Sequence, residues 1–181
     1  MKKFFLFLFP VALLLSCNDT AKKSATADNT PVVAADKPAV DLPYTASYSG
    51  SFNSDVSDQD LKMVLTSYKD WADGNVKGVA DAMADTLEFD AWDGSSSRLP
   101  RAGLLKRWTA FRDSMSSVKV EMEAWHKMHS TDKNENFIVV WYKEYDVFKS
   151  GKVDSSNWHD INQVKDGKIS YYAQYKKPMK K

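Results

Sequence analysis

The chain has 181 residues, with 25 Lys and Arg against 24 Asp and Glu, a length that allows one globular domain with an appendage but not two full domains. A hydrophobic fraction of 43% with 27% charged residues excludes a disordered chain, since disorder goes with low hydrophobicity and high net charge. The balanced charge argues against a DNA or RNA partner, because phosphate binding needs a surplus of Lys and Arg on one face.

The first seventeen residues have the pattern of a bacterial secretion signal. Two lysines precede an apolar run from Phe4 to Ser16, and the single cysteine, Cys17, follows at once. The run is shorter than the ~20 residues that a membrane-spanning helix needs. Leu14-Leu15-Ser16-Cys17 resembles the lipobox of bacterial lipoproteins, which implies a signal peptide over 1–16 and a lipid on Cys17. The alternative is a plain secretory signal with an incidental cysteine.

Residues 17–43 are predicted to be the lipidated cysteine and a flexible tether. Their Ser, Thr, Ala, Asp, Lys and Pro residues show neither helical nor strand periodicity. The expected location is therefore the bacterial cell envelope, with the lipid bilayer as partner through Cys17 and the leaflet left open. A globular domain over 44–178 and a tail over 179–181 complete the chain. The last lysines are interpreted as a solvated end: Lys176, Lys177, Lys180 and Lys181.

Two helices are predicted at the start of the domain. Ser57, with Asp60 three residues later, is typical of a helix N-terminus, and apolar residues then recur at helical spacing until Gly74. This pattern predicts a helix over 58–73, with an apolar stripe of Leu61, Val64, Leu65, Tyr68, Trp71 and Ala72. Asn75 is expected to cap a second, shorter helix.

A third helix is expected after an extended segment over 86–92 and a turn at Asp93-Gly94. Pro100 suits the first turn of this helix, because a proline there loses no helical hydrogen bond. Its apolar stripe is Leu104, Leu105, Trp108, Phe111 and Met115.

From residue 117 the hydrophobic period changes from about 3.6 to 2, which indicates strands. Three further extended runs follow, over 136–148, 156–165 and 168–176, with turn signals at Ser150-Gly151 and Asp166-Gly167. Helices followed by successive hairpins predict an α+β fold, in which three helices pack on a strongly curved antiparallel sheet.

This order resembles the nuclear transport factor 2-like superfamily, including its SnoaL-like and ketosteroid isomerase branches. The matching segments are Tyr68 to Asn75, Met83 to Thr86, and Trp158 to Ile169 with its Asp166-Gly167-Lys168-Ile169 turn. The resemblance covers about residues 57–176. It implies a cone, in which the bent sheet wraps around the first helix and a pocket opens at one end.

The resemblance also makes Asp160 the only candidate catalytic residue. It falls where the ketosteroid isomerase branch keeps an acid that hydrogen-bonds a substrate oxygen. That branch's general base falls at Ala91, beside Asp90, and its oxyanion-hole tyrosine falls at Ser67, one residue before Tyr68, so isomerase activity is not expected. The structural alternatives for Asp160 are a surface position and a buried acid satisfied by Trp or Tyr donors. Inside an open cone its pKa should rise, unless such a donor stabilises the charged form.

Four aromatic residues are candidates for the wall of a ligand pocket. Aromatic walls with a few polar groups suit a planar or apolar small molecule, and the alternative for each residue is core packing or a dimer face. The candidates are Trp92, Trp108, Trp158 and Tyr172. No metal is assigned, since His126 and His129 are expected on opposite strand faces and His159 lacks companion ligands. No cofactor is expected either.

Three functions remain open. The leading prediction is a membrane-tethered envelope protein with a small-molecule pocket and no assigned enzyme activity. The first alternative is a SnoaL-like acid–base enzyme, and the second is a homodimeric scaffold with a filled cone. An open pocket with a perturbed acid would favour the enzyme, an open neutral pocket the binding protein, and a filled cone the scaffold.

Overall fold

The structure, a computed structural model, describes residues 41–180. The predicted signal peptide over 1–16, Cys17 and nearly all of the tether lie outside the described residues. The elements below all belong to one compact unit, Leu42–Lys181. Within the described part of the chain, no helix has the length and apolar character needed to cross a membrane.

The first two helices begin and end where their caps predict. Helix α1 spans Asp58–Asp73, and the Ser57 side chain accepts a hydrogen bond from the Asp60 N–H at 3.0 Å. It ends at Gly74, whose φ of 81° lies in the left-handed region that glycine adopts without strain. Helix α2 spans Val76–Ala82, and the Asn75 side chain accepts from the backbone N–H of Gly78.

The third helix, α3, spans Arg101–Arg112 and begins after Pro100, which was predicted to lie in its first turn. Pro100 is the N-cap of this helix and the last residue of strand β3, Ser96–Pro100, rather than a residue of the first helical turn. Strand β3 was not predicted, because the polar run before Leu99 has no alternating apolar pattern.

Seven strands form one sheet in the order β1-β4-β5-β6-β7-β2-β3. The remaining strands are β1 Phe52–Asn53, β2 Met83–Asp90, β4 Met115–Ser130, β5 Glu135–Phe148, β6 Val153–Lys165 and β7 Lys168–Pro178. The four predicted strands correspond to β4 to β7. The sheet is not entirely antiparallel as predicted, because β2 pairs with β7 in parallel.

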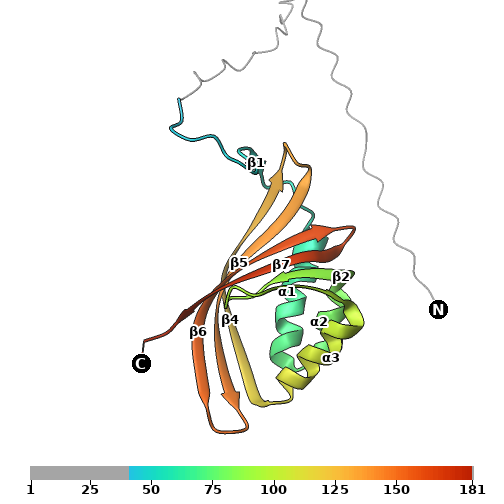
Figure 1. Ribbon diagram of the computed structural model, residues 1–181, viewed down its shortest axis with the longest axis vertical. Coiled ribbons are helices and arrows are strands. Elements are labelled where there is room, and N and C mark those ends of the chain that lie inside the picture. The colour runs from blue at the N-terminus through green and yellow to red at the C-terminus, as the bar shows by residue number, and fades with distance from the viewer. Residues whose placement is uncertain (1–40, 181) are drawn as a thin grey trace, which may run out of the picture. The chain divides into compact units, whose positions relative to one another are not determined.

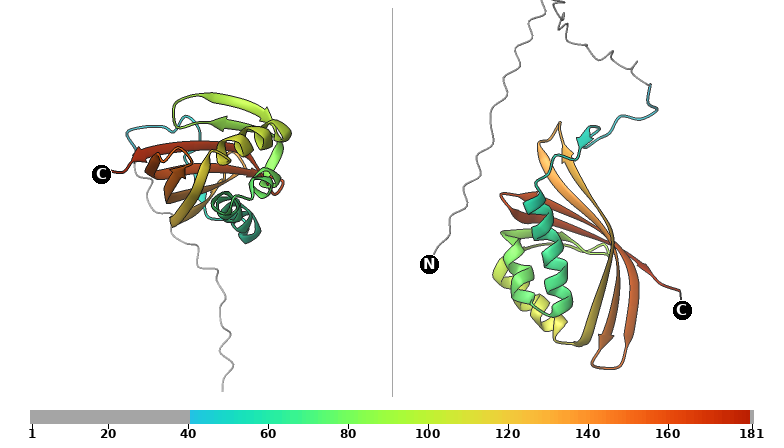
Figure 2. Two further views of the ribbon diagram at one scale, coloured as in Figure 1. Left: turned by 90° about the horizontal axis from the view of Figure 1, so that it is seen from below. Right: turned by 180° about the vertical axis from the view of Figure 1, so that it is seen from behind.

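The sheet is strongly bent, and the three helices lie on its concave side (Figure 1). Figure 2 shows from two further directions that α1 lies in the hollow of the sheet. A register shift between Met122 and Ala124 marks a bulge in the long strand β4, and bulges of this kind bend a strand. The predicted α+β class, with three helices on a curved sheet, is confirmed.

The core lies between α1 and the concave face of the sheet. Val64 of α1 is completely buried, as are Ile138 and Val140 of β5. Leu65, also part of the predicted stripe, is only partly buried beside this core. The core is continuous with the pocket described next, because Tyr68, Tyr142 and Trp158 belong to both.

Candidate functional site

A cavity of about 580 Å³ opens in the cone between the helices and the sheet. Its wall is largely aromatic and includes residues of α1, α3, β2, β5, β6 and β7, among them Trp71, Trp92, Trp108, Phe111, Tyr142, Trp158 and Tyr172. All four aromatic residues predicted for the wall, Trp92, Trp108, Trp158 and Tyr172, line it. Trp158 also belongs to the hydrophobic core, whereas Trp92 is 55% exposed at the cavity. The cone is open rather than filled.

Asp160 lies behind this wall instead of in it. The residue is completely buried and is not among those that line the cavity. Its Oδ2 accepts hydrogen bonds from the hydroxyls of three tyrosines: Tyr68 at 3.0 Å, Tyr142 at 2.9 Å and Tyr172 at 2.6 Å. Of the structural alternatives for Asp160, a buried acid with tyrosine donors describes this arrangement, in which all three donors bind Oδ2.

The pKa of Asp160 is raised from its ordinary value of 3.8 to about 7. Burial raises the pKa by disfavouring the charged carboxylate, and the hydrogen bonds from Tyr172, Tyr142 and Tyr68 oppose that rise. The phenol pKa values of the three tyrosines are raised well above their ordinary value, first of all by burial. The tyrosines therefore remain proton donors to Asp160.

Two amides support the tyrosine cluster from the cavity wall. The Nδ2 of Asn162 donates to the Tyr68 hydroxyl at 3.2 Å and to the carbonyl of Ile138 at 3.1 Å. The Nε2 of Gln174 donates to the Tyr172 hydroxyl at 2.9 Å. Both amides line the cavity, as do the three tyrosines, so Asp160 is connected to the cavity wall by three direct hydrogen bonds.

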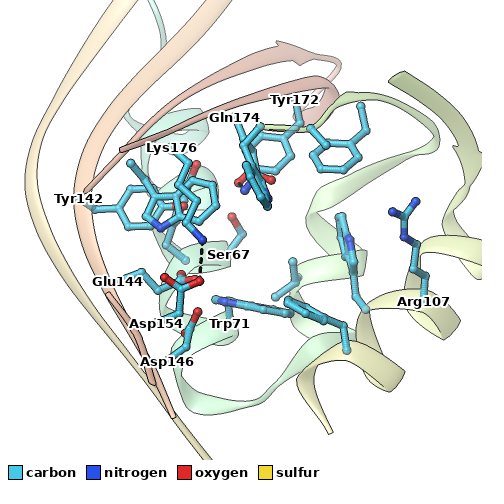
Figure 3. Close-up of a pocket in the computed structure, with 18 of the residues that line it drawn as sticks. Ser67, Trp71, Arg107, Tyr142, Glu144, Asp146, Asp154, Tyr172, Gln174 and Lys176 are labelled. Carbon is cyan, nitrogen blue, oxygen red and sulfur yellow. Dashed lines mark hydrogen bonds and ion pairs between the residues drawn. The ribbon is translucent and has the colours of Figure 1, made fainter. Parts of the chain in front are cut away.

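Three carboxyl groups that the sequence analysis did not single out form an acidic cluster at the cavity: Glu144, Asp146 and Asp154 (Figure 3). Asp146 of β5 pairs directly with Asp154 of β6, and Glu144 precedes Asp146 by two residues on the same strand face. Figure 3 places the cluster on one side of the cavity and Arg107 of α3 on the other.

The three carboxyl groups of the acidic cluster differ in their pKa values. Burial, with Asp146 close by, raises the pKa of Glu144 to about 9, so Glu144 is protonated near neutral pH and hydrogen-bonds to Asp146. Burial also raises the pKa of Asp146, to about 6. The hydrogen bond from Lys176 lowers the pKa of Asp154. A neutral acid, a weakly basic carboxylate and a firmly charged carboxylate therefore lie side by side.

Lys176 corrects the prediction of a solvated lysine tail. It belongs to β7, its side chain is 12% exposed, and its Nζ lies 2.7 Å from Asp154. The ammonium is also 4.8 Å from the ring centre of Trp92 and 5.1 Å from that of Trp158. The register that pairs Trp158 with Lys176 places this lysine on the inner face of the sheet.

Two of the three positions of the isomerase-type catalytic set are also at the cavity. Ser67 and Ala91 both line it, so the resemblance indicated the right place in the fold but not titratable groups. Asp90 lies outside the lining and accepts hydrogen bonds from Ser96 and Tyr171. Within residues 41–180, no group of three His, Cys, Asp or Glu side chains is arranged to hold a metal ion.

The acidic cluster could have been found from the periodicity of β5. The buried positions Ile138, Val140 and Tyr142 continue in phase to Glu144 and Asp146. Side-chain polarity alone would predict that the apolar Tyr145 and Val147 face inward and that the two acids face outward. The inward position of Glu144 and Asp146 therefore follows from continuing the alternation of buried residues along β5, and not from the polarity of the individual side chains.

Solved structures with low sequence identity share this architecture. AusH from Aspergillus nidulans has a TM-score of 0.54 at 12% identity, covering 67% of this chain and 86% of that one. A protein of ketosteroid isomerase-like fold from Catenulispora acidiphila, in complex with trimethylamine, has a TM-score of 0.52 at 10% identity, covering 63% and 84%. The chain has the nuclear transport factor 2-like fold.

Another structure with this fold is an LEH-like epoxide hydrolase from M. tuberculosis, with a TM-score of 0.51 at 14% identity over 66% of this chain and 83% of that one. Structures with the nuclear transport factor 2-like fold thus include an enzyme beside proteins of unknown function. No protein-family model and no curated protein sequence matches the chain. At these identities the likeness establishes the fold alone.

Proposed function

We propose that the domain binds a small organic molecule in the cone cavity. The observation that carries the proposal is the open cavity of about 580 Å³ with an aromatic wall and a few convergent polar groups. Ligand sites in proteins are clefts of roughly 300–1,000 Å³ with this mixture of apolar wall and polar groups. The structure of one protein with this fold contains trimethylamine, which supports the proposal that this chain also binds a small molecule.

The proposal includes a bacterial envelope location, with Cys17 carrying the lipid and the tether holding the domain away from the bilayer. Its support is the sequence pattern before Cys17. In a bacterial host, the full chain should sediment with membranes and Cys17→Ala should be released from them. Recovery of wild-type protein only in the soluble fraction would contradict this part.

A homodimer through the outer face of the sheet is a further part of the proposal. Trp141, His159 and Tyr175 form a ladder of neighbouring rings across three strands, and Trp141 and Tyr175 are exposed. Exposed aromatic residues of this kind are common at protein interfaces. Sedimentation analysis of wild type and Tyr175→Ala would measure the oligomeric state.

Ligand binding is tested with N-phenyl-1-naphthylamine, a neutral probe that becomes fluorescent in apolar pockets. Ala91 lines the cavity, so Ala91→Phe should fill part of it and abolish the fluorescence gain that wild type produces. The matched control is Ala124→Phe, at an exposed position on β4. No gain with wild type, or an equal gain with Ala91→Phe, would contradict binding in the cone.

Acid–base catalysis is a second candidate, favoured by the proton that Glu144 and Asp146 share at the cavity. A neutral acid beside a carboxylate can donate a proton to one substrate atom and accept one from another. Because Asp160 lies behind the wall, this proposal assigns the reaction to Glu144 and Asp146. Styrene oxide is a suitable first substrate, since an epoxide hydrolase shares the fold. Hydrolysis by wild type that is lost in Asp146→Asn would support it, and no hydrolysis by wild type would exclude this substrate.

A further inference from the structure

The acidic side of the cavity contains a buried acceptor without a donor. Among the described residues, three buried side-chain atoms lack a hydrogen-bond partner: Arg101 Nε, Asp146 Oδ1 and Asp160 Oδ1. Of these residues Asp146 alone lines the cavity, and it is 8% exposed. Leaving a buried carboxylate oxygen unpaired is costly, and a donor that enters the cavity would remove that cost.

The charges around Asp146 leave this acceptor negative. Glu144 is neutral near pH 7 because its pKa is about 9, and Asp154 is engaged by Lys176 and Ser156. Two cations lower the pKa of Asp146: Lys176, whose Nζ lies on Asp154, and Arg112 of α3, whose guanidinium donates to the carbonyls of Trp71 and Ala72. Among the described residues, neither cation donates a hydrogen bond to Asp146, and its Oδ1 has no partner.

The same wall already holds one ammonium group. The Nζ of Lys176 lies on the carboxylate of Asp154 and within about 5 Å of the ring centres of two tryptophans. Indole faces attract cations through their electron-rich surfaces. The cavity thus combines carboxylates with aromatic faces, the combination that stabilises a desolvated ammonium.

A second aromatic surface lies in the same cavity as Asp146. Trp71 and Phe111 are stacked with ring centres 6.2 Å apart, and both line the cavity. Figure 3 labels Trp71 and Asp146, and both residues line the same cavity. Within residues 41–180, no lysine or arginine side chain donates to Asp146 Oδ1 as Lys176 does to Asp154, so this acceptor is left for a donor on a bound ligand.

We infer that the cavity selects small molecules that carry a protonated amine on an aromatic or apolar body, with the ammonium on Asp146 Oδ1 and the body against Trp71 and Phe111. This inference rests on the proposed binding function and specifies its ligand class. The chemistry required is one N–H donor with positive charge, which neutral alcohols lack and carboxylates would oppose.

Three probes with one indole body and one linker test the inference: tryptamine, tryptophol and indole-3-propionate, which end in an ammonium, a hydroxyl and a carboxylate. Calorimetry at pH 7.5 should give tryptamine an affinity at least roughly tenfold above tryptophol, since a charge-assisted hydrogen bond contributes more than a neutral one. Indole-3-propionate should bind most weakly.

Asp146→Asn should remove most of the tryptamine advantage and change tryptophol binding little. The control is Asp90→Asn, a carboxylate of β2 that lies outside the lining, and it should leave all three affinities unchanged. A pH comparison keeps the test independent of variant folding. Between pH 7.5 and pH 5, Asp146 becomes protonated, so wild type should lose tryptamine affinity relative to tryptophol. Asp160 also titrates in this range, but it lies behind the cavity wall. The ratio of the tryptamine affinity to the tryptophol affinity corrects for this titration, because it affects both ligands.

Equal affinities for tryptamine and tryptophol, or an equal loss of both in Asp146→Asn, would overturn amine selection. Failure of all three indoles to bind would overturn it as well. The result with N-phenyl-1-naphthylamine decides the underlying binding function separately, so the two failures are distinguishable.

Discussion

The buried Asp160 should make the stability of the domain depend on pH. Its folded pKa of about 7 exceeds the ordinary value of 3.8, so the folded state holds the proton more tightly than the unfolded chain. The stabilising contribution is therefore complete below pH 4 and is lost as the pH rises through 7. Between pH 5 and pH 9, this stabilisation decreases only up to the folded pKa of about 7, because both states are deprotonated above it. Two pH units at about 1.4 kcal/mol per unit give a loss of about 3 kcal/mol.

The test is the free energy of unfolding by urea at pH 5 and pH 9, for wild type and for Asp160→Asn. The amide does not titrate, so the variant's decrease between the two pH values should be smaller than that of wild type by about 3 kcal/mol. Glu144 and Asp146 titrate in both proteins. Asp85→Asn is the control, because the Asp85 side chain is 97% exposed, and it should behave as wild type. An equal pH dependence in Asp160→Asn and wild type would refute the reasoning.

Four further substitutions test the core packing, the backbone conformation at Gly74 and the ionisation of Glu144. Val64→Ala removes a fully buried side chain and should cost roughly 2 kcal/mol in urea unfolding, more than Leu65→Ala, which acts at a partly buried site; the reverse order would contradict the core assignment. Gly74→Ala forces a Cβ onto a residue with φ of 81° and should lower the melting temperature through a loss of about 1 kcal/mol. Glu144→Gln should raise the melting temperature at pH 9, because the amide avoids ionisation in a buried place; no rise would place Glu144 in water.

Local chemistry made the helical half of the fold predictable. Ser57 and Asn75 cap helix N-termini through their side chains, and Gly74 ends α1 in a left-handed conformation. These are local effects, so the bounds of α1 follow from the sequence alone. Strand β3 has no such signal. Its place depends on pairing with β2, which is a tertiary contact that a polar run such as Ser95 to Arg98 does not encode.

The sequence predicts which face of the strand the site residues share, but not which of them line the cavity. Alternation along β6 correctly places Trp158, Asp160 and Asn162 on one face. Whether that face borders the cavity at a given residue depends on side chains from other elements. Tyr68 of α1, Tyr142 of β5 and Tyr172 of β7 meet over Asp160 and close it off, and no pattern within one strand predicts that convergence.

The acidic cluster is costly for a structural element, and this cost supports a role at the cavity. Along β5 the inner face is apolar at Ile138 and Val140, where it packs in the core, and becomes acidic at Glu144 and Asp146, where it borders the cavity. Placing Asp146 opposite Asp154 brings like charges together across the strands, and burial then raises the pKa of Asp146. Apolar residues of similar size would avoid both costs, as replacement of buried charged groups often stabilises a protein. Since stability lost at one place is typical of binding and catalytic sites, the change from apolar to acidic side chains along β5 supports the proposed role of the cavity.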